Sequence, residues 1–226
     1  MLLLVTDTSG KQGSVALARA GERDRDHVEL IEVVFLAGGM FSAQLVPQVA
    51  ALLAKHRFSK ADIDAFIVVS GPGSFTGLRV GLAAIKALGE ILKKPIVPVS
   101  LLEVVALAGE TQGRVAAVLD AGRGDIYFGA YEIAGDSLQV LQEQLLSRAE
   151  FLSVSRESTV VTPDTTWAAV AREAGLSVVV VEPASAEMVT RFGLRKLQAG
   201  KTVAPEQLEA NYMRRSDAEM FVKKSS

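Results

Sequence analysis

Residues 70–79, Ser-Gly-Pro-Gly-Ser-Phe-Thr-Gly-Leu-Arg, combine residue types that can hold an anion. The segment follows an apolar strand pattern and opens a helical one, so its amides would meet an anion at a helix N-terminus. One interpretation is therefore a loop that faces an anion or nucleotide. The other is a tight strand-to-helix connection whose glycines permit unusual backbone angles. No Gly-Lys-Ser or Gly-Lys-Thr follows, which excludes a P-loop. The residues here that could face a ligand are Gly71, Gly73, Ser74 and Thr76.

Two aspartates stand at the ends of apolar strand patterns. Asp7 opens the turn Asp7-Thr8-Ser9-Gly10, and Asp120 holds the corresponding place in the second half of the chain. An aspartate in such a position can help to hold a hydrated magnesium ion, but a turn role explains both residues equally well. Asp7, Thr8 and Ser9 complete the set of residues that could face a nucleotide or anion.

Residue types needed for metal binding and acyl transfer are scarce. The sequence has two histidines, His27 and His56, which stand alone, and it has no cysteine. A transition-metal site built on imidazole or thiolate groups is therefore not expected, and neither is a Ser-His-Asp triad. We predict no catalytic residue, no metal ligand and no cofactor bound by this chain alone.

Two segments with helical spacing have contrasting faces. The first carries an apolar stripe, and the second places small residues three or four apart. A glycine inside a helix costs about 1 kcal/mol relative to alanine, so a close contact should compensate for Gly81. That contact could be packing inside the domain or a helix of a partner chain, and in the latter case two helix pairs would form a four-helix contact. The predicted partner interface comprises Phe41, Leu45, Val49, Leu52, Gly77, Gly81, Ala84 and Leu88.

Composition limits the classes of function. The 226 residues suffice for one large or two small domains, and 24 basic against 26 acidic residues give a net charge of −2. This balance provides no general attraction to phosphate backbones. The basic pair Arg214 and Arg215 is either a local tRNA contact or part of a solvated tail. No apolar run is long enough to span a membrane, and the apolar start meets Asp7 at once, so we expect a cytoplasmic protein.

The pattern of elements repeats once along the chain. Strands are expected at 2–6, 14–19 and 28–36, then a helix from 41 to 57, a strand at 65–70, a helix at 75–92, a strand at 95–99 and a short helix after Ser100. The second half restarts with strands at 114–120, 125–133 and 138–146. It continues with a strand at 159–161, a helix around 165–174, a strand at 178–181 and a helix around 184–199.

The two halves also open alike, with Leu-Val-Thr-Asp-Thr-Ser at residues 4–9 and Ala-Val-Leu-Asp-Ala-Gly at residues 117–122. Each then continues with a strand meander followed by alternating helices and strands. This duplication predicts an α/β protein with two actin-like, ribonuclease-H-like (ASKHA) domains, each a mixed sheet flanked by helices. The predicted first domain covers residues 1–101 plus about 205–226, and the predicted second, smaller domain covers 102–204.

Residues 71–81, with Gly-Pro-Gly-Ser-Phe-Thr-Gly followed by Arg79 and Gly81, resemble the G-P-G-S-F-T-G-x-R-x-G segment of the bacterial TsaB (YeaZ) family. Residues 4–8 are similar to the opening strand and D-T turn of that family. Residues 118–127 resemble its D-A-R-x-x-x-V-Y segment, with Gly122 in place of the usual arginine, and residues 200–214 resemble its closing segment. The resemblance spans the chain.

The resemblance implies a scaffold or regulatory subunit of the complex that forms N6-threonylcarbamoyladenosine at position 37 of tRNAs reading codons that start with A. The implied partners are the catalytic paralogue TsaD and the ATPase TsaE. TsaD carries the metal-binding histidines and the transfer chemistry, so ATP or ADP and metal are expected in the partner subunits. The resemblance also implies a homodimer in the absence of partners, contact with tRNA through the complex, and no membrane association.

The chain departs from the family pattern in two places. A histidine often starts the first long helix of the family, where this chain has Phe41-Ser42, and the turn at Asp7 lacks a small-residue stretch that some members carry. We therefore expect weak or no ATP binding by the chain alone. Two alternatives remain: a stand-alone actin-fold phosphotransferase, which would need phosphate loops in both halves, and a glycoprotease-like metallopeptidase, which would need paired histidines.

Overall fold

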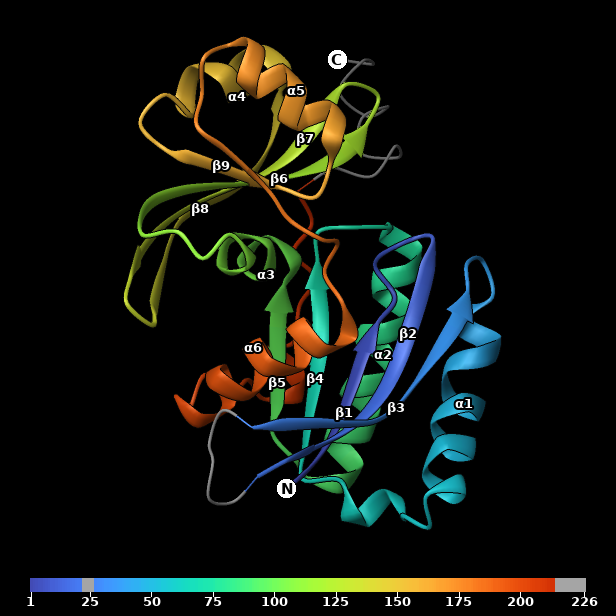
Figure 1. The fold of residues 1–226 in the computed structure, drawn as a ribbon. Coiled ribbons are helices and arrows are strands. Elements are labelled where there is room, and N and C mark those ends of the chain that lie inside the picture. The colour runs from blue at the N-terminus through green and yellow to red at the C-terminus, as the bar shows by residue number, and fades with distance from the viewer. Residues whose placement is uncertain (22–26, 214–226) are drawn as a thin grey trace. The chain divides into compact units, whose positions relative to one another are not determined.

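The computed structural model describes residues 1–21 and 27–213, and it divides the chain into two units (Figure 1). The first unit comprises Met1–Ser100 and Ser185–Asn211. The second comprises Leu101–Ala184 together with the described residues Tyr212 and Met213. Each unit is built on one five-stranded sheet.

The first sheet has the strand order β3-β2-β1-β4-β5. The three strands that open the chain form an antiparallel meander, and β4 and β5 run parallel to β1. The strands are β1 (Leu2–Asp7), β2 (Gln12–Ala20), β3 (Val28–Ala37), β4 (Ala65–Gly71) and β5 (Ile96–Ser100), and the helices of this unit are α1 (Phe41–Lys55), α2 (Phe75–Leu92) and α6 (Ala186–Gln198).

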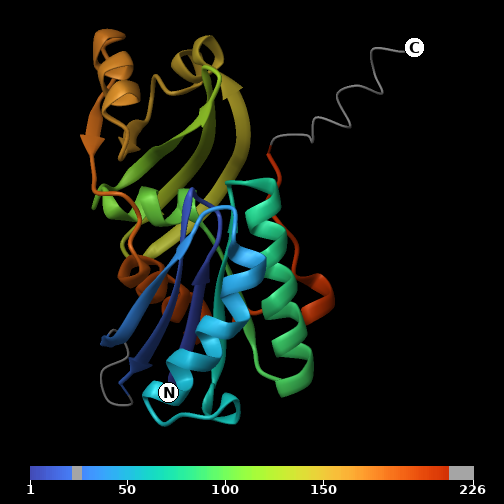
Figure 2. The same cartoon turned by 90° about the vertical axis from the view of Figure 1, so that its right-hand side faces the viewer.

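Side-chain alternation along β4 shows how both faces of the first sheet are covered. Phe66 and Val68 join the core under α1 and α2, whereas Ile67 points to the opposite face. There α6 lies so close that a Cβ added to Gly193 would be 2.5 Å from a methyl group of Ile67. Helices α1 and α2 lie side by side on one face, and α6 covers the other (Figures 1 and 2).

The second sheet has the order β8-β7-β6-β9-β10, which repeats the order of the first sheet strand for strand. Its first three strands are again antiparallel neighbours, and β9 and β10 continue the sheet in parallel. The elements are β6 (Gly113–Gly122), β7 (Asp125–Ala134), β8 (Ser137–Ser147), β9 (Thr159–Thr162), β10 (Val178–Val180), α3 (Leu101–Ala108), α4 (Arg148–Val154) and α5 (Thr165–Glu173).

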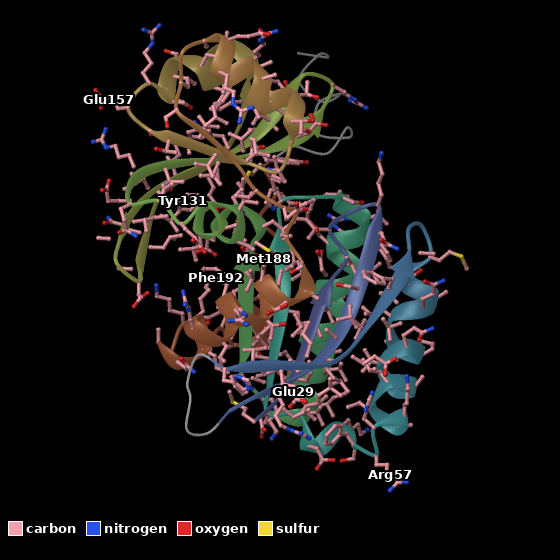
Figure 3. All side chains as sticks on the ribbon, viewed as in Figure 1. Glu29, Arg57, Tyr131, Glu157, Met188 and Phe192 are labelled. Carbon is pink, nitrogen blue, oxygen red and sulfur yellow. The ribbon has the colours of Figure 1, made fainter. Side chains whose placement is uncertain are left out.

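Large side chains fill both faces of the second sheet. On one face Phe151 of α4 packs with its ring centroid 6.5 Å from Phe128 and 6.3 Å from Trp167 of α5. On the other face α3 covers Tyr131, whose hydroxyl donates a hydrogen bond of 2.5 Å to Glu143 (Figure 3). The aromatic rings supply much of the volume that separates these helices from the sheet.

The structure confirms the predicted fold class but corrects the predicted division. Helix α6 follows β10 in the sequence, yet its buried residues Val189 and Leu194 pack in the first unit. Residues 185–204, which were predicted in the second domain, therefore belong to the first unit. Helix α3 follows β5 without a linker and packs on the second sheet. The two units thus exchange their third helices, and adjacency in sequence predicted the wrong sheet for α6. Tyr212 and Met213 belong to the second unit rather than to the first.

Helix α4 is the one α-helix in residues 1–21 and 27–213 that the sequence pattern did not predict, and two short 3-10 helices, η1 (Lys60–Asp62) and η2 (Pro205–Gln207), were not predicted either. The signal for α4 was a capping box, in which Ser147 accepts from the Glu150 amide and Glu150 accepts from the Ser147 amide. Across the described ranges, none of the helices has the length and apolar character needed to traverse a bilayer.

Candidate functional site

The residues predicted to face a nucleotide come from two loops, and the structure brings these loops together. The turn after β1 lies against the connection between β4 and α2, where the Ser74 amide donates to the carbonyl oxygen of Ser9 at 2.7 Å. The approach at Gly73 is closer still, because an added Cβ would lie 2.4 Å from the same carbonyl oxygen. Glycine at position 73 therefore permits backbone-to-backbone contact that a side chain would prevent.

Polar groups of this cluster form hydrogen bonds with one another. Asp7 Oδ1 accepts from the Ser9 amide at 2.8 Å and from Ser9 Oγ at 2.6 Å. Thr8 Oγ1 donates to the carbonyl oxygen of Gly77 at 2.8 Å, and both Thr8 and Ser9 are buried. The hydroxyl groups of Thr8 and Ser9 thus hold the turn together and against α2, whereas Thr76 is exposed.

The start of α2 is capped from within the chain. Ser74 Oγ accepts from the Gly77 amide at 3.3 Å, and the Ser74 amide is held by Ser9. Gly71, at a φ of 136°, makes room for the backbone of Asn211, whose amide donates to Ser70 at 2.8 Å. This geometry favours the tight connection over the anion-facing loop, because partners inside the chain occupy the amides of Ser74 and Gly77.

Burial raises the pKa of Asp7, and the two hydrogen bonds from Ser9 oppose that rise. A magnesium or transition-metal site would need further oxygen or nitrogen ligands around this carboxylate. In the part of the chain that the structure describes, no group of three or more His, Cys, Asp or Glu side chains lies close enough together to hold a metal ion.

Asp120, the counterpart of Asp7 in the second unit, also serves local structure. Its Oδ1 accepts from the Gly122 amide at 3.1 Å and from the indole nitrogen of Trp167 at 3.2 Å. The carboxylate thus joins the hairpin between β6 and β7 to α5, which is the turn interpretation of this residue.

The predicted partner interface needs correction, because most of its side chains are buried in the first unit itself. Phe41, Leu45, Val49 and Leu52 belong to the core between α1 and the sheet, with exposures of 1–8%. Gly77 and Gly81 face the turn after β1, and Ala84 and Leu88 are partly buried against the same core. Helical spacing identified residues that share a face, but that face is turned toward the chain's own sheet.

The opposite sides of α1 and α2 carry the apolar surface that sequence analysis missed. Val46 is 60% exposed and Ile91 is 70% exposed. The exposed residues of α1 are mostly alanines, whereas α2 exposes Arg79 and Glu90 as well as Ala83 and Ala87. The signal was present in the spacing of small residues along both helices, but it was weaker than the leucine stripe. The outer face, as we call it, comprises Ala43, Val46, Pro47, Ala50, Ala51 and Ala54 of α1 and Thr76, Ala83, Ala87 and Ile91 of α2.

His56 has a structural place at the end of α1. Its Nε2 lies 2.7 Å from Glu32 Oε2 on β3, and Lys55 Nζ contacts the same carboxylate at 2.7 Å. Hydrogen bonds from Lys55 and His56 lower the pKa of Glu32. The predicted tRNA contacts, Arg214 and Arg215, lie outside the described residues.

Two sheets of identical strand order, with exchanged third helices, define a duplicated actin-like protein. The family model described as TsaD, tRNA N6-adenosine threonylcarbamoyltransferase, matches residues 36–183. The tRNA threonylcarbamoyladenosine biosynthesis protein TsaB of Bacillus subtilis is 31% identical over 159 residues, which are 70% of this chain and 67% of the relative. TsaB of Escherichia coli is 29% identical over 231 residues, covering 96% of each chain.

Other similarities agree with these matches. A solved structure from Pseudomonas aeruginosa, of an uncharacterised protein with similarity to peptidase YeaZ, has a TM-score of 0.72 at 23% identity and covers 94% of this chain and 99% of its own. An uncharacterised protein of Mycobacterium tuberculosis is 39% identical over 109 residues, so the chain spans about half (51%) of the length of that relative. The chain belongs to the TsaB (YeaZ) family.

Proposed function

We propose that this chain is a non-catalytic scaffold subunit in the formation of N6-threonylcarbamoyladenosine at position 37 of tRNAs reading codons that start with A. Relatives named TsaB are biosynthesis proteins for this modified nucleoside, which supports the pathway. The observation that carries the scaffold role is the contrast within the first unit. Its polar turn residues Asp7, Thr8 and Ser9 bond inside the chain, while α1 exposes alanines and Val46 and carries no charged residue before Lys55.

The partners we propose are a TsaD-like catalytic paralogue and a TsaE-like ATPase. The match of the TsaD family model to residues 36–183 supports a paralogue of similar fold, which would offer a helix pair resembling α1 and α2. Two such pairs would form a four-helix contact that buries about 1,200–2,000 Å² in total. In the absence of the paralogue, the same face of a second copy of this chain would take its place as a homodimer.

The chemistry of the outer face suits such a contact. Along α1 the first charged residue is Lys55 at its end, so docking a helix there desolvates few polar groups. Alanine side chains allow two helix axes to come close together, and Val46 and Ile91 provide larger apolar anchors. ATP or ADP, metal and the transfer step belong to the partner subunits in this proposal, and tRNA is contacted through the complex.

Reconstitution tests the proposal. The purified chain alone should neither hydrolyse ATP nor modify tRNA. A mixture with the TsaD-like and TsaE-like proteins, supplied with threonylcarbamoyl-adenylate, should transfer the threonylcarbamoyl group, and omitting the chain should abolish most of that transfer. Robust modification by the chain alone would overturn the scaffold role. Calorimetry with ATP provides a second readout, since micromolar affinity of the isolated chain would support the phosphotransferase alternative instead.

A further inference from the structure

The turn after β1 contacts α2 where the helix has no side chains. A Cβ added to Gly77 would lie 2.1 Å from the carbonyl oxygen of Thr8, and one added to Gly81 would lie 2.3 Å from Thr8 Oγ1. Both separations are far below van der Waals contact. Thr8 therefore fills the space left by two glycines on successive turns of the helix, and its hydrogen bond to Gly77 holds it there.

Helix α1 meets the same contact through its first residue. The ring of Phe41 lies against Gly77, where an added Cβ would be 3.2 Å from Cε2, and against Gly13 of β2, where the separation would be 2.8 Å from Cε1. Thr8 and Phe41 are 1% and 6% exposed, so neither offers a surface to a partner. Their positions nevertheless determine how deep α2 lies on the sheet and where α1 begins beside it.

We infer that Thr8 is a positioning residue for partner binding. It sets the depth of α2 relative to α1, and thereby the shape of the outer face, without touching the partner. This inference rests on the proposed docking of a partner helix pair at that face. Packed interiors transmit small displacements, because side chains there have no free volume into which to relax. A shift of α2 at Gly81 should therefore reach Ala83 and Ala87 on the opposite side of the same helix turns.

The first test is a double-mutant cycle between Thr8 and Gly81. Gly81→Ala introduces a methyl group against Thr8 Oγ1 and pushes α2 outward. Thr8→Ala removes Oγ1 and Cγ2, after which the nearest Thr8 atom to that methyl group is Cβ at 3.4 Å. The double variant should therefore recover affinity that Gly81→Ala loses. Gly193→Ala is the matched control, because its methyl group would lie 2.5 Å from Ile67 in the same unit but on the face away from α1 and α2.

Affinity for the TsaD-like partner is measured by calorimetry at a temperature where circular dichroism shows every variant folded. We expect Gly81→Ala to weaken binding about tenfold and the double variant to bind more tightly than Gly81→Ala. Gly193→Ala should bind like the wild type. Equal weakening by Gly81→Ala and Gly193→Ala would overturn the inference, because loss of stability alone would then explain both.

A second pair of variants covers the case in which Gly81→Ala does not fold. Thr8→Ala introduces no clash and should still weaken binding about threefold, whereas Thr8→Ser keeps Oγ1 and should bind like the wild type. If Thr8→Ala also binds like the wild type, Thr8 does not position the outer face. Val46→Asp separates this inference from the proposed function. If Val46→Asp weakens binding while the Thr8 variants do not, only the inference fails; if Val46→Asp has no effect, the docking site itself is wrong.

Discussion

The two units share one strand order but fix their second helices in different ways. In the first unit α2 approaches the turn after β1 at two glycines, where Gly77 meets the carbonyl oxygen of Thr8 and Gly81 meets its side chain. In the second unit the corresponding helix, α5, is fixed by large and polar side chains, since Trp167 packs on Phe151 and bonds to Asp120. The same strand order is therefore compatible with glycine contacts beneath α2 in one unit and with aromatic packing beneath α5 in the other.

The outward sides of these two helices differ as well. Helix α1 exposes no charged residue before Lys55, and α2 exposes Arg79 and Glu90 beside Ala83, Ala87 and Ile91. Helix α5 exposes Thr165, Thr166, Arg172 and Glu173. Charged and hydroxyl side chains of this kind are typical of a solvated helix surface. The partner docking that we propose lies on the first unit, where close packing beneath α2 supports the outer face above it.

Among variants that test this difference between the two units, we expect the largest loss of stability from a substitution at Gly77. In Gly77→Ala the new methyl group meets the backbone oxygen of Thr8, which cannot rotate away as a side chain would. We expect the free energy of unfolding of the first unit to fall by about 3 kcal/mol or more. Denaturant unfolding followed by circular dichroism measures the change. Ala168 of α5 already carries a methyl group. Ala168→Gly should lower the free energy of unfolding by only about 1–2 kcal/mol, through a small cavity and the lower helix propensity of glycine.

A smaller difference is expected between the two helix caps. Asp164 Oδ1 accepts from the amides of Thr166 and Trp167 at 2.8 and 3.1 Å, whereas Ser74 Oγ accepts one amide at 3.3 Å. Asp164→Ala should destabilise the protein by about 1–2 kcal/mol and Ser74→Ala by about 0.5 kcal/mol. Thermal unfolding of both variants under the same buffer conditions measures the two losses. An equal or larger loss in Ser74→Ala would mean that the cap of α2 depends on more than this hydrogen bond.

The smallest effects are expected from two carboxylates whose pKa values move in opposite directions. Burial raises the pKa of Asp7 above its ordinary value of 3.8. The protonated Asp7 therefore contributes its full stabilisation of the fold below pH 3.8, and this stabilisation is lost as the pH rises through the raised pKa. Asp7→Asn retains an acceptor for Ser9 and should be more stable than the wild type at neutral pH. Hydrogen bonds lower the pKa of Glu32, so its contribution is present above the ordinary value of 4.5 and is lost as pH falls.

The measurement is the stability of Asp7→Asn and Glu32→Gln, relative to the wild type, from pH 3 to pH 8, which spans both ordinary pKa values. The advantage of Asp7→Asn should grow with increasing pH, and the deficit of Glu32→Gln should shrink as pH decreases. A deficit of Asp7→Asn at neutral pH would show that the charge on Asp7 stabilises the turn, contrary to this account.

Sequence patterns predicted the strands well because their signal is local. Each strand shows either alternating apolar and polar residues or an apolar run in its own sequence. The similar segments that end at Asp7 and Asp120 indicated that the two halves of the chain are duplicates. The placement of α3 and α6 was not predictable in this way, because adjacent residues gave no sign that neither helix packs on the sheet whose strand precedes it in the sequence. Helix α4 was short enough for its capping box to be its main signal.

The candidate site shows the same limit more clearly. Helical spacing grouped Phe41 with Leu45 on one face of α1 and Gly77 with Gly81 on one face of α2. Spacing alone cannot show which part of the protein, or which partner, each face contacts. Only the position of Thr8, far away in sequence, shows that Gly81 belongs to an internal contact. The apolar surface left for a partner then lies on the alanine-rich sides that the pattern did not emphasise.

The central claim is that the chain acts through the outer face of its first unit. The most direct measurement compares Val46→Asp with Val154→Asp, because both valines are exposed on helices, at 60% and 51%, one on the outer face and the other on α4 of the second unit. Affinity for the TsaD-like partner is measured by calorimetry, with circular dichroism as the folding control. We predict that Val46→Asp, which buries an unpaired charge in the contact, abolishes measurable binding and that Val154→Asp binds like the wild type. Wild-type binding by Val46→Asp, or equal loss in both variants, would contradict the claim.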